Sequence, residues 1–200
     1  MKGVLRKLVS KAHHVDVSVV EMHAGTGKFE NVERAIASAS KPLSQYDWLV
    51  ITDDDIDVSS KALDLLIQFS EDASLTFSQP AHSFISHASL FVTQRQSSSL
   101  VRETRFVEIG PLTLINRRAF GKIIPFPPSR WCWGIDVYWS HLAKLNNWRM
   151  GVIDAVPMTH LKPPGGSYPV DEAVSEADAL LRRLGVTEGR EILSHSRMIL

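Results

Sequence analysis

The most constraining feature of this sequence is a short apolar run that ends in a cluster of aspartates. Residues 48–51 are apolar and include β-branched side chains, which is typical of a buried strand. Asp53, Asp54, Asp55 and Asp57 follow within a few positions. Carboxylates this close together cannot stay in an apolar core without partners or a metal, so the strand must leave the sheet here. The pattern predicts an α/β fold with an acidic site at the carboxyl end of this strand.

The acidic cluster has two interpretations. Alternate carboxylates at a strand end suit a hard divalent cation, which takes oxygen ligands and can hold a phosphate at the same time. The alternative is an acidic turn that leads into a helix, with Asp57 acting only as a helix cap.

Composition places the chain among globular proteins with one domain. Hydrophobic residues make up 44% of the 200 positions, and 22 basic side chains balance 22 acidic ones, which gives no nucleic-acid signal. The single Cys132 excludes an internal disulfide and fits a cytoplasmic location. No apolar run has the length of a membrane span. Residues 1–14 predict an amphipathic helix packed on the sheet, with peripheral membrane contact as the alternative.

Strand and helix patterns alternate along the chain. They predict a mixed, mostly parallel sheet with helices on both faces. Besides the strand at 48–51, strands or extended segments are expected at residues 15–22, 73–77, 100–109, 112–115, 151–153 and 156–160. Helices are expected at residues 1–14, 31–38, 61–69 and 117–123, from Asp136 onward, and at 170–184 and 188–198.

A loop rich in proline and tryptophan is the second informative stretch. Trp131 and Trp133 are costly to expose, and tryptophans in such loops often line a binding surface. Asp136 follows at the start of a helix, where a carboxylate also favours the positive end of the helix dipole. The tryptophans could equally pack the loop against the core.

A glycine-punctuated loop at residues 23–28 ends in Lys28. It resembles a phosphate-binding loop but lacks the spacing of a P-loop or a dinucleotide fingerprint. Lys28 is therefore either a phosphate contact or a solvated loop residue.

In their order, these parts resemble glycosyltransferases of the GT-A fold, close to the inverting family-2 type. The likeness covers residues 15–160 and comprises the Gly-Lys loop, the Asp-x-Asp strand end, a Gly-Pro strand, a Trp-Gly-Ile-Asp helix start and a strand pair that ends in His160. The resemblance implies a nucleotide-diphosphate sugar donor, a saccharide or other hydroxyl acceptor, and Mn²⁺ or Mg²⁺.

The resemblance also implies roles for residues on the donor side. Asp53, Asp55 and His160 would bind the metal. Lys28, Asp53 and Asp54 would contact the nucleotide.

On the acceptor side, Asp136 would be the catalytic base of an inverting displacement. Trp131 and Trp133 would bind the acceptor.

Proteins of this type begin with a strand and loop that hold the nucleotide base, whereas only a helix is expected before residue 15. We therefore expect a single domain over residues 1–200, with three explanations open: the chain is truncated at its N-terminus, its start is misassigned, or its donor site differs. Two other functions stay open. A non-catalytic sugar- or nucleotide-binding module would keep the same fold, and a haloacid-dehalogenase-type phosphotransferase fits Asp55-Ile56-Asp57-Val58 locally.

Overall fold

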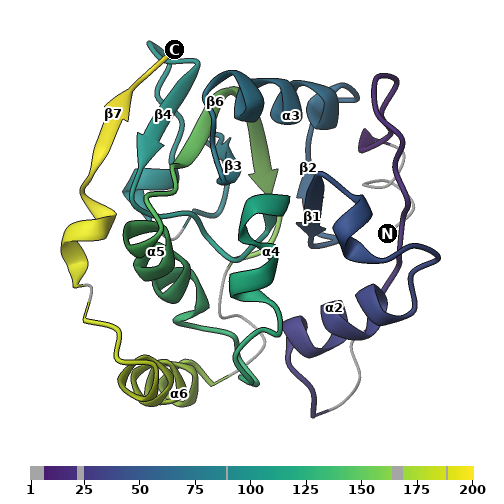
Figure 1. Cartoon of the computed structure of the whole chain (residues 1–200). Helices are drawn as coiled ribbons and strands as arrows, with labels where there is room; N and C mark the ends of the chain where they lie inside the picture. The colour runs from purple at the N-terminus through teal and green to yellow at the C-terminus, as the bar shows by residue number, and fades with distance from the viewer. Residues whose placement is uncertain (1–6, 22–24, 89, 164–168, 188) are drawn as a thin grey trace.

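The computed structural model describes residues 7–21, 25–88, 90–163, 169–187 and 189–200 (Figure 1). Within these ranges, seven strands form one mixed sheet in the order β1-β5-β3-β6-β4-β7, with β2 paired to β6. The strands are β1 (Trp48–Thr52), β2 (Ile56–Asp57), β3 (Phe77–His82), β4 (Val101–Thr104), β5 (Leu112–Asn116), β6 (Met150–His160) and β7 (Ser196–Met198).

Helices connect and cover these strands. The α-helices are α2 (Lys28–Ala37), α3 (Ala62–Asp72), α4 (Arg117–Ile123), α5 (Ile135–Leu145) and α6 (Val170–Arg183). The described part of the chain also has three short 3₁₀ helices, η1 (Leu43–Gln45), η2 (Phe91–Thr93) and η3 (Arg190–Leu193).

The α/β class and the mixed sheet are confirmed, but the expectation of a mostly parallel sheet is wrong. Of the six pairings between named strands, β3 with β6 is parallel and the other five are antiparallel. In particular, β5 lies between β1 and β3 and runs antiparallel to both. Apolar strand patterns look the same in either direction, so the local sequence could not report strand orientation.

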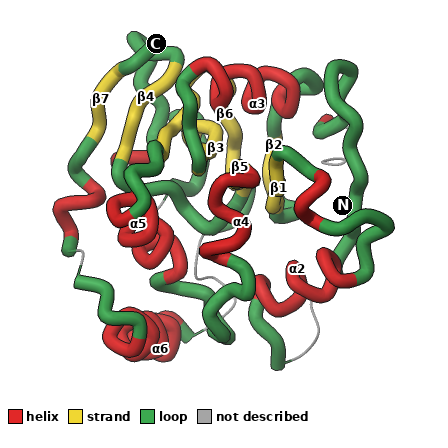
Figure 2. Tube along the Cα trace, in the orientation of Figure 1, coloured by secondary structure: helices red, strands yellow, loops and turns green. Residues whose placement is uncertain are grey.

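Helices cover both faces of the sheet, as expected (Figure 2). On one face, Leu66 of α3 packs with Leu114 of β5 in a first core. On the other face, Trp139 of α5 packs with Phe77 of β3 and Ile115 of β5 in a second core. Alternation along β5 explains the two cores, because neighbouring side chains of a strand point to opposite faces.

Several local predictions are confirmed to within a few residues, among them α3, α4, β5 and α6. Helix α4 begins at Arg117 because the Asn116 side chain accepts a hydrogen bond from the backbone nitrogen of Arg118 at 3.2 Å. It ends before Pro125, and the residue that precedes a proline is disfavoured in a helix.

The segment of residues 15–21 is extended but forms no strand ladder, so the strand prediction there is wrong. Alternation makes a segment suitable for a strand, yet a ladder also needs a neighbour, and none of the described strands pairs with it. Asp16 holds the segment through a 2.6 Å hydrogen bond from Tyr46 Oη to its Oδ2. Met22 lies outside the described residues.

Both ends of the chain also differ from the prediction. Residues 8–14 are not helical, although Leu8 is buried in the first core, and residues 1–6 lie outside the described part. The expected helix at 188–198 is replaced by η3 and β7, and residue 188 is not described. Strand β7 forms because the open edge of β4 offers it a pairing partner.

A buried ion pair holds the middle of β6. Asp154 is fully buried, and its Oδ2 accepts a hydrogen bond from Arg102 Nε of β4 at 2.7 Å. Its Oδ1 accepts from Arg102 Nη2 at 3.1 Å and from the backbone nitrogen of Gln96 at 2.8 Å. Because Asp154 is charged, two separate extended segments were predicted on either side of it, whereas the structure has one continuous strand.

We expect Asp154→Ala to destabilise the fold by about 3–5 kcal/mol, because it leaves the buried guanidinium of Arg102 unpaired. Asp47→Ala is the control, since it removes an exposed ion pair with Arg117 and should cost less than about 1 kcal/mol. Urea denaturation of both variants measures the difference. Equal losses would show that the buried pair does not support β6.

Candidate active site

The pairing of β2 with β6 brings the acidic cluster to the predicted metal-binding histidine. Ile56 lies opposite His160, and the backbone nitrogen of Leu161 donates to the Asp55 carbonyl at 2.9 Å. As a result, His160 Nε2 lies 3.4 Å from Asp55 Oδ1. Lys162 Nζ lies 3.8 Å from the other carboxylate oxygen of Asp55.

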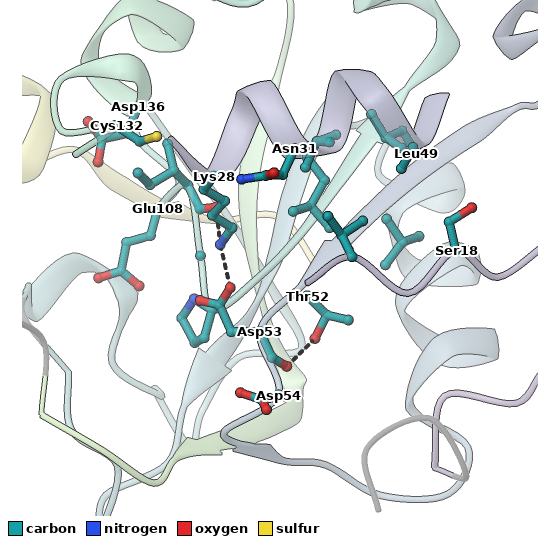
Figure 3. A pocket seen from close by; sticks show the side chains of 18 of the residues that line it. Ser18, Lys28, Asn31, Leu49, Thr52, Asp53, Asp54, Glu108, Cys132 and Asp136 are labelled. Carbon is teal, nitrogen blue, oxygen red and sulfur yellow. Dashed lines mark hydrogen bonds and ion pairs between the residues drawn. The ribbon is translucent and has the colours of Figure 1, made fainter. Parts of the chain in front are cut away.

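Asp53 is held by Lys28 rather than by the Asp55–His160 pair. Lys28 Nζ lies 2.6 Å from Asp53 Oδ1 and donates to the Ile109 carbonyl at 3.2 Å, as Figure 3 shows for the ion pair. The backbone nitrogen of Asp53 donates to the Pro111 carbonyl at 2.7 Å. The Gly-Lys loop and the Asp-x-Asp strand end, 25 positions apart, therefore meet at one point.

Gly110 makes room for this ion pair. A Cβ atom at Gly110 would lie 2.6 Å from Lys28 Nζ and 2.8 Å from Asp53 Oδ2. Both distances are shorter than a van der Waals contact, so a larger residue would have to displace Lys28 or Asp53.

Asp136 lies in the first turn of α5, directly after the loop of tryptophans. Gly134 precedes the helix with φ at +85°, a conformation that favours glycine. The Asp136 side chain is half-buried, and its Oδ1 accepts a hydrogen bond from the backbone nitrogen of Val137 at 2.8 Å. Burial raises the pKa of Asp136 to about 7, and the negative charge of Glu108 adds to the rise.

Helix α6 fixes the tryptophan loop. Glu176 accepts hydrogen bonds from the backbone nitrogens of Arg130 at 2.7 Å and Trp131 at 2.8 Å, and from Ser129 Oγ at 3.0 Å. The Arg130 guanidinium lies 4.6 Å from the centre of a Trp131 ring. The loop is thus ordered by a carboxylate of α6 whose role was not predicted from the sequence.

All the predicted site residues line one cavity of about 2040 Å³: Lys28, Asp53, Asp54, Asp55, Trp131, Trp133, Asp136 and His160. The cavity also extends between residues 15–21 and β1. Asp54 is exposed on its wall, whereas Asp57 lies in β2 opposite Thr159, exposed and in contact with Lys7. The cavity wall thus includes residues from distant parts of the sequence, of which Lys28 with Asp53 and Asp55 with His160 are in contact, and the roles implied for them stay predictions.

The expected three-residue metal site is not formed in this arrangement. Across the described ranges, no group of three or more His, Cys, Asp or Glu side chains is placed to hold a metal ion. Asp55 and His160 are nevertheless in contact and offer an oxygen and a nitrogen donor. A Mg²⁺ ion that also binds substrate phosphates is commonly held by one or two protein carboxylates, and Asp55 supplies one; the imidazole of His160 suits a transition-metal ion better than Mg²⁺.

Some residues in and behind the cavity wall were not predicted from the sequence. Glu108 lines the cavity beside His82, and Gln79 contacts Glu108 from β3. The one sequence signal for Glu108 is an acidic residue near the end of an alternating apolar segment. Nothing in the sequence links it to His82, because that contact spans 26 positions and depends on tertiary packing.

Comparison of the chain with protein-family models and with curated proteins finds no match. Among the described residues, the helices are all too short or too polar to span a lipid bilayer.

Asp136 should make stability depend on pH. Its pKa is about 7 in the folded protein and near its ordinary 3.8 in the unfolded chain, so the folded state binds the proton more tightly. The stabilisation of the folded state by this tighter proton binding is complete below about pH 4 and is lost as the pH rises through about 7.

We therefore expect Asp136→Asn to match the parent near pH 4 and to exceed its stability at about pH 8 by up to about 4 kcal/mol. Asp72→Asn, at an exposed position on α3, should change stability by less than about 0.5 kcal/mol at either pH. Urea denaturation across this pH range is the measurement. A constant difference between parent and Asp136→Asn would contradict the burial of a titrating carboxyl.

Proposed function

We propose that this chain is a glycosyltransferase that moves a sugar from a nucleotide-diphosphate sugar to an acceptor hydroxyl with inversion. One observation carries the proposal. The half-buried carboxyl of Asp136, with a pKa of about 7, lines the same cavity as the Lys28–Asp53 and Asp55–His160 pairs. A general base works best when its pKa lies near the working pH, and this base shares a cavity with groups suited to a diphosphate.

The donor diphosphate would bind at the edge formed by the Gly-Lys loop and the Asp-x-Asp strand. Lys28 supplies a positive charge there, and Asp53 holds its ammonium group in place. Mn²⁺ or Mg²⁺ bound by Asp55, His160 and the diphosphate would offset the negative charge of the leaving group. Asp54, exposed on the same wall, would contact the nucleotide sugar by hydrogen bonds to its hydroxyls.

The reaction would be a single displacement. The acceptor hydroxyl gives its proton to Asp136, and its oxygen forms a bond to the anomeric carbon. The bond from that carbon to the phosphate oxygen breaks, and its electron pair leaves with the nucleoside diphosphate. Attack from the face opposite the leaving group inverts the anomeric centre. Trp131 and Trp133 would pack against the acceptor.

The geometry is less favourable to a phosphotransferase of the haloacid dehalogenase type. That mechanism needs Asp57 as the acid–base partner of Asp55, yet Asp57 contacts Lys7 and is turned away from the cavity.

The first test is turnover of Asp136→Asn. Release of nucleoside diphosphate is measured with a panel of donors and acceptors, and we expect a loss of about a hundredfold or more, since Asn cannot accept the proton. Parent turnover should rise with pH through about 7, as Asp136 ionises. Asp72→Asn is the control and should keep parent turnover.

Equal turnover of Asp136→Asn and the parent would reject the base. Donor binding without transfer or hydrolysis, in every donor–acceptor combination, would instead favour a binding module.

The second test concerns the Lys28–Asp53 pair. Gly110→Ala should lower affinity for a nucleoside diphosphate by about tenfold, because the new methyl group would displace Lys28 or Asp53. Gly121→Ala in α4 meets no atom within 4 Å and should leave affinity unchanged. Calorimetric titration with manganese present compares them. If Gly110→Ala binds the nucleoside diphosphate as tightly as the parent does, Lys28 is not part of the donor site.

A further inference from the structure

Glu108 is a buried carboxylate of the cavity for which the proposed transfer has no use. It lies between β4 and β5, is 9% exposed, and lines the cavity with Asp136. A buried carboxylate is costly unless partners or a ligand compensate for its lost hydration. The contacts of Glu108 therefore indicate its role.

Two side chains of β3 hold Glu108 from one side. Oε2 lies 2.7 Å from His82 Nε2 and accepts a hydrogen bond from Gln79 Nε2 at 3.3 Å. The backbone nitrogen of Glu108 donates to Gln79 Oε1 at 2.6 Å, and its carbonyl accepts from Thr113 Oγ1 at 2.6 Å. His82 and Gln79 are almost fully buried, so the carboxylate is fixed before any ligand arrives.

The hydrogen-bond chain continues to β6. His82 Nδ1 lies 2.7 Å from Ser86 Oγ, which accepts a hydrogen bond from the backbone nitrogen of His160 at 2.8 Å. The carboxylate of Glu108 is therefore tied to the same strand end that places His160.

The second carboxylate oxygen has no such partner. Among the described residues, none forms a hydrogen bond with Glu108 Oε1, while Oε2 receives both contacts. A carboxylate can accept about four hydrogen bonds, so roughly half of its capacity stays available at the cavity wall. A ligand that binds at Oε1 must therefore donate a hydrogen bond to it.

Charge decides which ligand this oxygen can take. A diphosphate would be repelled by Glu108 and attracted to Lys28, which lies with Asp53. Glu108 and Asp136 lie on one side of Lys28 in Figure 3, and the charge of Glu108 also contributes to the raised pKa of Asp136. A neutral ligand that donates hydroxyl hydrogens fits beside Asp136, and the acceptor is the neutral substrate.

We propose that Glu108 binds a second hydroxyl of the acceptor, next to the one that reacts at Asp136, so that the acceptor is a saccharide. The inference rests on the proposed function for its assignment to the acceptor. Neighbouring hydroxyl groups of a pyranose could reach Asp136 and Glu108 together, which an acceptor with a single hydroxyl cannot do. His82 and Gln79 are positioning residues for Glu108.

Binding of simple glycosides tests the proposal without turnover. The probes are methyl hexopyranosides of gluco, galacto and manno configuration, titrated into the whole chain and followed by NMR. We expect at least one to bind the parent, and Glu108→Gln to bind it about tenfold or more weakly, since a hydrogen bond to a charged acceptor is lost. Nucleoside diphosphate affinity should not change. Glu172→Gln, exposed on α6, is the matched control and should behave as the parent.

A measurement on the parent protein avoids dependence on the folding of the variant. A bound glycoside should shift the imidazole resonances of His82, because His82 shares the Glu108 carboxylate. Failure of all three glycosides to bind, binding without a His82 shift, or parent-like binding by a folded Glu108→Gln would each overturn the proposal. If only this proposal fails, the parent protein still turns over its donor. If the proposed function fails, the parent turns over no donor although it still binds a glycoside.

Discussion

Pairing along β6 is the constraint on which the rest of the structure depends. This strand joins β3 in parallel and β4 in antiparallel register, and its far end pairs with β2. Eleven residues stay in one strand although Asp154 lies in the middle, because Arg102 neutralises that charge inside the sheet. With β6 continuous, His160 reaches the end of the sheet at which the acidic cluster leaves β1.

Carboxylates line both parts of the cavity wall, but cationic side chains lie beside those at the strand end. Lys28 pairs there with Asp53 and Lys162 lies near Asp55, so a diphosphate with its metal ion would fit at this part of the wall. Asp136 and Glu108 lie together where a neutral polyol fits better. Such an arrangement suits two substrates that must meet at one carbon. Burial, with a smaller contribution from the charge of Glu108, raises the pKa of Asp136 to about 7. Glycosyl transfer is the proposal that uses both sides.

Local sequence predicted much of the site and many of the elements. The apolar run before Asp53 gave a strand that ends at the cavity, and the start of α5 placed Asp136 correctly. Helices α3 and α4 and strand β5 also match, because side-chain periodicity, an Asn cap and prolines act within a few residues. Ion pairing between Lys28 and Asp53, in contrast, was not foreseen.

The sequence by itself determined where helices α3, α4 and α6 and strands β1 and β5 lie, and that the aspartates after Thr52 leave the core. Only the tertiary structure decided strand direction, the pairing of β7 with β4, and the lack of a ladder at residues 15–21. It also decided the contact between Glu108 and His82, which lie 26 positions apart in the sequence. Periodicity and capping depend on neighbours in the chain, whereas ladders and buried ion pairs depend on partners that only folding brings close.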